Sequence, residues 1–259
     1  MAKGNRPRGG GGGGGSPRER IENARTLSDA IQIADRAGIH TSAEVLRDVH
    51  DEQLIKDGLA EAAWVKEEFP IVGDIQITSD PSHKSAYMYS DLGSNTIAYA
   101  GFNGENTRMR ANEYRAGAVL TDRNGLTDSP KGTTMKHVVT HEMGHQVVRA
   151  ASDAIVAKAT NGKYTTSTKA VQDVVADRIV QTAYQSMPTS QRGRRGVSAL
   201  SKSISKYAWS GGSHETIAEA LADYRANGNN AQPFSKSIYN TLKSFTTSSN
   251  IDALASSLR

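Results

Sequence analysis

The stretch His141-Glu142-Met143-Gly144-His145 places two histidines four residues apart, with a glutamate directly after the first. Four residues of an α-helix turn about 40° beyond one full rotation and rise about 6 Å, so both imidazoles face one side. Two imidazoles so arranged can hold one metal ion, and the glutamate between them can take a proton from water on that ion. The spacing therefore predicts a catalytic metal centre on a helix.

The residues around this motif predict a helix over 133–151 with one buried side. Random placement of the 7 histidines in 259 residues would give the five-residue pattern roughly 0.01 times per chain. Apolar side chains also recur at helical spacing on both sides of the histidines. They are Val138, Val139, Met143, Val147 and Val148.

The sequence before the motif has the shorter period of β-strands. Ile75 and Ile77 alternate with polar residues, and 86–89 and 96–102 are further short β-prone runs separated by turn residues. A fourth strand is expected at 117–121. We therefore expect a small, mostly antiparallel sheet ahead of the active-site helix.

The remaining sequence has mostly helical periodicity. Before the sheet, Ser28 is placed to cap a helix that Gly38 ends, and Thr41-Ser42-Ala43-Glu44 resembles a capping box that opens a helix ending before Pro70. After the motif, helices are expected over 167–186, 197–207, 213–226 and 234–245. The fold class predicted is α+β, with a small sheet, the active-site helix and a helical C-terminal part.

Composition and charge exclude several classes of site and partner. The chain has no cysteine, which excludes disulfide scaffolds, thiol nucleophiles and iron–sulfur clusters, so any metal must be held by His, Asp or Glu. Residues 1–20 hold five basic side chains and one acidic one, which equals the net charge of +4 of the whole chain. We therefore expect no nucleic-acid partner except through this basic, glycine-rich tail.

A third metal ligand is expected in the segment 213–223. Glu215 and Glu219 lie one helical turn apart and share a face. One of them can bind the ion while the other accepts a hydrogen bond from a liganding imidazole and so fixes its orientation. His214 remains an alternative third ligand.

Other titratable residues compete for the same role. His137 lies four residues before His141, but a straight helix separates His137 and His145 by about 12 Å along its axis, so both cannot bind one ion. His137 is expected beside the ligands or on the surface. Asp173 and Asp177 share a helix face and could serve as ligands, although a solvated pair of carboxylates is the simpler interpretation.

The combination of H-E-x-x-H with a helix that reads E-x-x-A-E at 215–219 resembles the gluzincin metallopeptidases. The likeness is to the anthrax lethal factor type and to the related metallopeptidase-like domains of phage head proteins. It covers residues 133–150 and 205–225. The resemblance implies that Glu215 is the zinc ligand, that Glu219 supports a liganding histidine, and that Tyr207 stabilises the oxyanion; Tyr207 could instead be a core residue.

The resemblance also implies a fold, an activity and partners. It implies a zincin-like metallopeptidase domain over 71–259. The helical pattern before it predicts a helical segment at 18–70, and the glycine-rich composition predicts a flexible basic tail at 1–17. The activity implied is zinc-dependent hydrolysis of peptide bonds in a protein or peptide, with Glu142 as general base and then general acid. Phage head proteins are implied as possible partners.

The alternative is a non-catalytic, zinc-containing structural or interaction protein, for instance one associated with a phage head. The intact Glu142 argues against this alternative, because a structural zinc needs no general base. No apolar run approaches the length of a membrane span, and no apolar segment follows the basic residues at the N-terminus. We therefore expect no membrane partner, no secretory signal, and a cytoplasmic or virion-associated protein.

Overall fold

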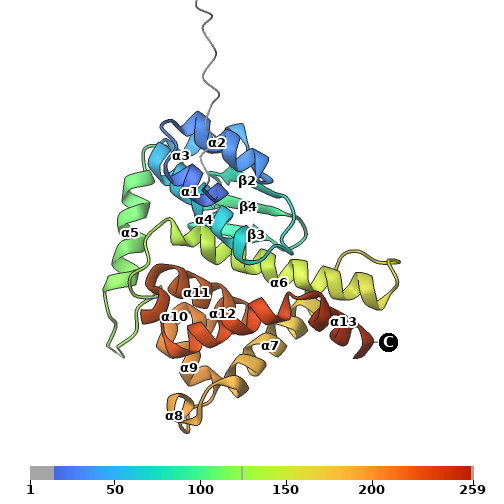
Figure 1. Cartoon of the computed structure of the whole chain (residues 1–259). Coiled ribbons are helices and arrows are strands. Elements are labelled where there is room, and N and C mark those ends of the chain that lie inside the picture. Colours follow the sequence, from blue (N-terminus) through green and yellow to red (C-terminus); the bar gives the residue numbers. More distant parts are fainter. Residues whose placement is uncertain (1–14, 124, 258–259) are drawn as a thin grey trace, which may run out of the picture.

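The structure is a computed structural model that describes residues 15–123 and 125–257 and is mostly helical (Figure 1). One small sheet packs against the long helix α6 (His137–Ala159), which carries the H-E-x-x-H motif. Most of the predicted tail, residues 1–14, lies outside the described residues. Chain order begins with α1 (Pro17–Glu22), α2 (Leu27–Arg36), β1 (Ile39–Thr41), α3 (Ala43–Val49), α4 (Glu52–Glu68), β2 (Ile75–Asp80), β3 (Met88–Asp91), β4 (Thr96–Ala100) and α5 (Thr107–Val119).

The second half of the chain is helical from α6 onward. Three of the predicted helices are confirmed closely, whereas 197–207 is divided at Ser205 into two short helices. The elements that follow α6 are α7 (Lys169–Ser186), α8 (Thr189–Arg192), α9 (Val197–Ile204), α10 (Lys206–Ser210), α11 (Gly212–Asn227), a 3-10 turn (Gly228–Asn230), α12 (Pro233–Phe245) and α13 (Ser248–Ser257).

The N-terminal helices differ in detail from the prediction. Thr26, not Ser28, caps α2, because its hydroxyl accepts a hydrogen bond from the Asp29 amide at 3.1 Å. The predicted capping box is also wrong: α3 begins after Ser42, whose hydroxyl donates to Thr78 on β2 instead of capping the helix. A left-handed residue at His50 (φ 51°) then separates α3 from α4.

The sheet is mixed, so the prediction of a mostly antiparallel sheet is wrong. Its order is β1-β2-β4-β3, with β1–β2 and β2–β4 parallel and only β3–β4 antiparallel. The parallel pair β1–β2 is connected through α3 and α4, the kind of crossover that parallel strands require. The hairpin places β3 on the outside of β4, where one of its edges has no partner strand among the described residues.

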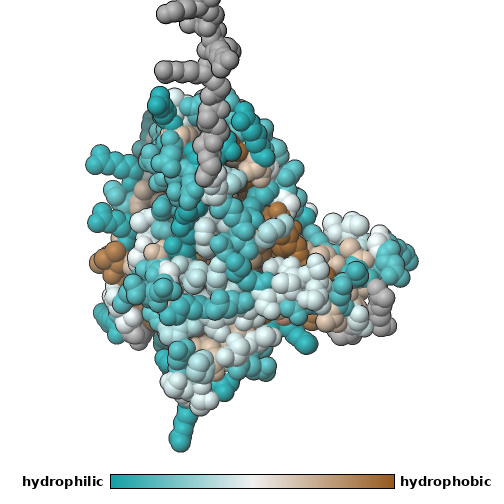
Figure 2. Space-filling view, in the orientation of Figure 1, coloured by the Kyte–Doolittle hydropathy of each residue, from teal (hydrophilic) through white to brown (hydrophobic). Residues whose placement is uncertain are grey.

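The strand predicted at 117–121 is also wrong. These residues form the end of α5 and the irregular segment that follows it. Val119 and Leu120 are 64% and 70% exposed, whereas strand residues of a buried sheet would be covered. Figure 2 shows a brown patch over α5 at the left-hand edge of the molecule, in agreement with these exposed apolar side chains.

A close contact between α6 and α11 brings the two halves of the predicted site together. Gly144 lies at this contact: a Cβ there would lie 3.0 Å from Ala218 Cα and 3.2 Å from the end of Leu221. The glycine therefore allows the two helices to approach closely. Met143 and Val147 of α6 are fully buried beside it, which anchors the motif in the core.

The helix α4 packs against α6 and contributes a buried carboxylate to the interior. Glu61 is 1% exposed and accepts hydrogen bonds from Thr140 of α6 at 2.9 Å and from Arg225 of α11 at 2.7 Å. Lys136 Nζ lies 3.5 Å away. Because β1 also pairs with β2, the segment before residue 71 and the segment after it share both a sheet and a core. No helix in the described part of the chain combines the length and apolarity needed to cross a membrane.

Candidate metal centre

Three predicted ligands converge between α6 and α11. One ligand atom from each of His141, His145 and Glu215 can be chosen so that all three lie within 4.8 Å of one another. Glu215 Oε2 lies 3.1 Å from His141 Nε2 and 3.5 Å from His145 Nε2. Two imidazoles and a carboxylate at this separation form a group that could hold a metal ion.

An unsatisfied carboxylate oxygen is consistent with a cation in this group. Glu215 Oε2 is buried and makes no hydrogen bond of acceptable geometry within the described residues. Buried polar atoms without partners are rare in folded proteins and call for an explanation, such as a bound ion. The nitrogen and oxygen donors present, without sulfur, suit a divalent metal of intermediate softness.

The electrostatics of the group also favour a cation. Burial would raise the pKa of Glu215, but the two histidines hold that pKa far below its usual range. Burial would lower the pKa of His141, yet Glu215 and Glu219 raise it well above its ordinary value. The same negative charge that attracts a proton to this group would attract a metal ion, and the two compete for the liganding atoms.

Glu219 lies where the resemblance predicts it, beside a liganding histidine. Its Oε1 is 2.8 Å from His141 Nδ1, and its side chain is 4% exposed. An Nδ1–H donated to this carboxylate leaves the lone pair of His141 Nε2 directed toward Glu215. Glu219 Oε2 accepts a second hydrogen bond, from the hydroxyl of Ser205, at 2.7 Å.

Glu142 is buried next to the three ligands without being one of them. It is 6% exposed and lines, together with His141, the walls of two adjoining cavities. Burial is the main cause that raises the pKa of Glu142, and the charges of nearby carboxylates add to the effect. A carboxylate with a raised pKa is better matched to proton transfer near neutral pH.

Tyr207 of α10 covers one face of the centre. Its ring stacks on His141 with centroids 5.7 Å apart and planes inclined by 22°, while the residue is 49% exposed. Partial burial of the phenol, together with the charges of Glu215 and Glu142, raises the pKa of Tyr207 to about 12. The phenol therefore stays protonated and can donate a hydrogen bond.

The alternative ligands are not brought into the group. His214 Nε2 lies 3.2 Å from Asp173 Oδ1 on the outer side of the site, and Asp177 accepts a hydrogen bond from Ser213. His137 accepts a hydrogen bond from the Thr134 amide at 2.9 Å. Burial lowers the pKa of His137 to about 4, so this histidine is a neutral residue of the interior.

Two cavities meet at the centre and form a cleft between α6, β3 and α10. Their volumes are about 340 and 540 Å³. The smaller one also reaches Tyr114 and Val138, whereas the larger one continues past His214 to Asp173. The residues shared by both walls are Ala86, Met88, His141, Glu142 and Tyr207.

Gly211, at the start of α11, lies against Glu215 and is a position that the sequence did not single out. A Cβ there would lie 2.2 Å from Glu215 Cγ and 2.7 Å from Glu215 Cβ. Only a glycine lets the Glu215 side chain fold back along the first turn toward the histidines. The neighbouring glycines in the sequence are a weak signal of this, because the contact depends on a side-chain orientation that sequence does not give.

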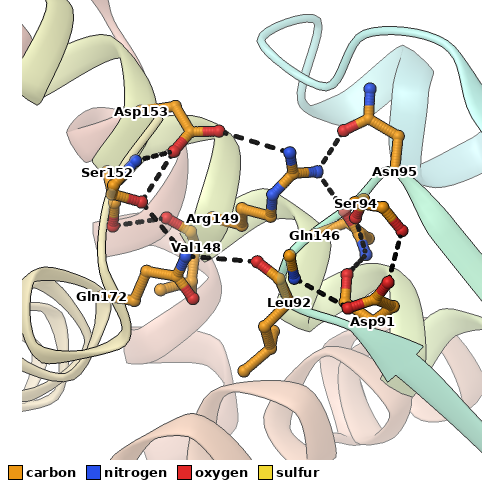
Figure 3. A network of polar contacts seen from close by, with 12 residues as sticks. Asp91, Leu92, Ser94, Asn95, Gln146, Val148, Arg149, Ser152, Asp153 and Gln172 are labelled. Carbon is orange, nitrogen blue, oxygen red and sulfur yellow. Dashed lines mark hydrogen bonds and ion pairs between the residues drawn. The ribbon is translucent and has the colours of Figure 1, made fainter. Parts of the chain in front are cut away.

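A polar network fixes the edge strand relative to the motif (Figure 3). Gln146, next to His145, donates from its amide to Ser90 Oγ at 2.7 Å and to the Asp91 and Ser94 carbonyls, both at 3.2 Å. One turn further along α6, Arg149 reaches Asn95 and Asp153. Gln172 of α7 donates to the Leu92 carbonyl at 3.4 Å. The hairpin that carries β3 is thus tied to the helix that carries the histidines.

Comparisons of the chain with protein-family models, with curated proteins and with solved structures give no match.

Proposed function

We propose that this protein is a zinc-dependent metallopeptidase with His141, His145 and Glu215 as the zinc ligands. The observation that carries the proposal is the convergence of these three side chains, within 4.8 Å, beside the buried carboxylate of Glu142. Three protein ligands are typical of catalytic zinc sites, which leave one coordination position open, whereas structural sites are usually closed by four.

A zinc ion at this place would lower the pKa of a water molecule and polarise the carbonyl of a peptide bond. Glu142, buried beside the three side chains, takes the proton of the attacking water and then delivers it to the leaving amine. Tyr207, which lines both cavities and stays protonated, donates a hydrogen bond to the oxyanion.

The substrate proposed is an extended segment of a protein or peptide. The cleft is bounded on one side by β3, whose outer edge has no partner strand among the described residues. An extended chain can add to such an edge through main-chain hydrogen bonds, which would lay a peptide bond across the metal centre. The resemblance to phage head-associated domains adds a head protein as a proposed substrate or partner.

The test is a digest of a mixed peptide library by the wild type and by Glu142→Gln. Loss of a general base costs 10²–10⁴-fold in rate as a rule, so we expect cleavage to fall by about 10³-fold. Zinc content should be the same in both proteins, because Glu142 lies outside the ligand group. Cleavage by the variant at the wild-type rate would refute the mechanism.

The same experiment separates catalysis from the non-catalytic alternative. A wild-type protein that binds zinc and cleaves no member of the library would favour a structural or interaction role. If wild-type protein purified with zinc in the buffer contained no zinc, both the catalytic and the non-catalytic zinc proposals would be refuted.

A further inference from the structure

Ser205 is a buried polar residue next to the candidate metal centre, and it has no role in the proposed mechanism. It lies at the junction of α9 and α10 in an extended conformation and is 1% exposed. Its hydroxyl donates to Glu219 Oε2 at 2.7 Å and accepts from the Ala208 amide at 2.9 Å. One hydroxyl thus caps α10 and holds a carboxylate of α11.

The contact with Glu219 connects Ser205 to a metal ligand. Glu219 uses both oxygens: Oε1 faces His141 Nδ1 at 2.8 Å and Oε2 faces Ser205. No arginine or lysine pairs with Glu219 within the described residues. Without the hydroxyl, Oε2 would be left buried and unpaired, and the carboxylate could turn away from the imidazole.

The contact with Ala208 connects the same hydroxyl to the other side of that imidazole. Ser205 is the N-cap of α10, which begins at Lys206 and carries Tyr207. The Tyr207 ring stacks on His141. The edge of His141 and its face are therefore held by two groups, Glu219 and Tyr207, that both depend on Ser205.

We infer that Ser205 is a positioning residue that fixes His141 for metal binding through Glu219. The inference rests on the proposed metal site but not on its catalytic activity. Outer partners of a liganding histidine usually contribute 10–100-fold to metal affinity, so Ser205→Ala should weaken zinc binding by about 10-fold.

The experiment is a zinc titration of the metal-free full chain in competition with a chromophoric chelator. The variants are Ser205→Ala, Glu219→Gln and the double variant. If Ser205 acts through Glu219, the double variant should bind zinc no more weakly than Glu219→Gln alone, because the two changes break one connection. Effects that multiply in the double variant would overturn the inference.

Ser201→Ala is the matched control. Ser201 is also buried, at 3% exposed, and its hydroxyl accepts from Thr216 of α11 at 3.2 Å without touching Glu219. Its loss should leave the zinc affinity within about twofold of the wild type, since no ligand depends on it. An equal loss of affinity in Ser201→Ala and Ser205→Ala would mean general loosening of α11 and would refute a specific role.

A second variant covers the case in which Ser205→Ala does not fold. Ser205→Gly removes the hydroxyl but keeps a residue that is tolerated at an N-cap at a cost of only a few tenths of a kcal/mol. Zinc affinity of Ser205→Gly equal to that of the wild type would overturn the inference while leaving the metal site intact. Absence of zinc binding by the wild type would instead overturn the proposed function.

Discussion

Two polar clusters lie one turn apart on α6 and differ in how their hydrogen bonds are satisfied. In the anchoring network around Gln146 and Arg149, the amide of Gln146 reaches acceptors on the hairpin and its carbonyl accepts from Arg149 at 3.2 Å (Figure 3). In the candidate metal centre, Glu215 Oε2 is buried, faces Nε2 of both histidines and makes no hydrogen bond of acceptable geometry among the described residues.

This difference indicates that the first cluster stabilises the fold and that the second one is suited to binding a ligand. Buried groups whose hydrogen bonds are paired, like the amide and carbonyl of Gln146, stabilise the fold without any ligand. A buried carboxylate oxygen without a hydrogen bond is costly in the metal-free protein and is explained by a ligand that completes it. Changes in the two clusters should therefore affect different measured quantities.

The largest effect is expected from removing a ligand. His145→Ala should reduce zinc affinity by more than about 100-fold, the upper range for a mere outer partner of a ligand. The melting temperature of the metal-free protein should change little by comparison, because His145 Nδ1 has no hydrogen bond among the described residues that the substitution could remove. Zinc titration and thermal unfolding in the presence of a chelator would check both statements. If the metal-free variant were much less stable but bound zinc as tightly as the wild type, His145 would serve the fold and not metal binding.

A smaller effect on the same quantity is expected from Gly211→Ala. The added methyl would overlap Glu215 Cγ, so the carboxylate must move and zinc affinity should fall by about 10-fold. Gly196→Ala is the control, since a Cβ at Gly196 meets nothing within 4 Å. Equal zinc affinities in the two variants would show that Glu215 does not need its folded-back conformation.

The anchoring network should respond in stability rather than in zinc content. Gln146→Ala leaves the Ser90 hydroxyl and the carbonyls of the hairpin without their buried donor. The free energy of unfolding should decrease by about 1–3 kcal/mol, with zinc per chain unchanged. Chemical unfolding of the metal-free and zinc-loaded proteins measures this. If Gln146→Ala were as stable as the wild type but bound no zinc, the network around Gln146 would serve metal binding, contrary to this account.

The smallest effect is expected far from the centre, at a paired carboxylate between α4 and α12. Burial would raise the pKa of Glu68, but Lys243, at 2.7 Å, and Tyr239 hold it below its usual value. A lowered folded pKa contributes stability that is present above the unfolded pKa of about 4.3 and is lost as the pH falls through the folded pKa. Glu68→Gln should therefore be less stable than the wild type at neutral pH, and this difference should vanish in acid. A difference that persists unchanged near pH 3 would exclude the ionic origin.

The long helices after the motif and the candidate ligand pairs follow from local sequence, whereas α5 and the sheet do not. Helical spacing fixes which side chains share a face, so the pairs His141–His145 and Glu215–Glu219 were predictable without tertiary information. Strand direction depends on pairing with distant segments. Ile39-His40-Thr41 is too short to show an alternation, and the parallel pairing of β2 with β1 and with β4, which makes the sheet mixed, joins segments that local sequence does not relate.

The positioning residues could not be predicted for a related reason. Gly211 and Ser205 act through contacts that exist only after α10 and α11 have packed, at a side-chain conformation of Glu215 and at one oxygen of Glu219. A glycine before a helix or a serine at its N-cap is common, and local sequence gives either residue an adequate explanation. The role proposed for them beside a metal site rests on the geometry alone.

The central claim is that His141, His145 and Glu215 together hold a zinc ion. Elemental analysis of the purified wild type beside Glu215→Ala, both prepared with zinc available, tests it most directly. We predict about one zinc per chain in the wild type, as for a site with three protein ligands, and a strongly reduced content in the variant. No zinc in the wild type, or equal zinc in both proteins, would contradict it.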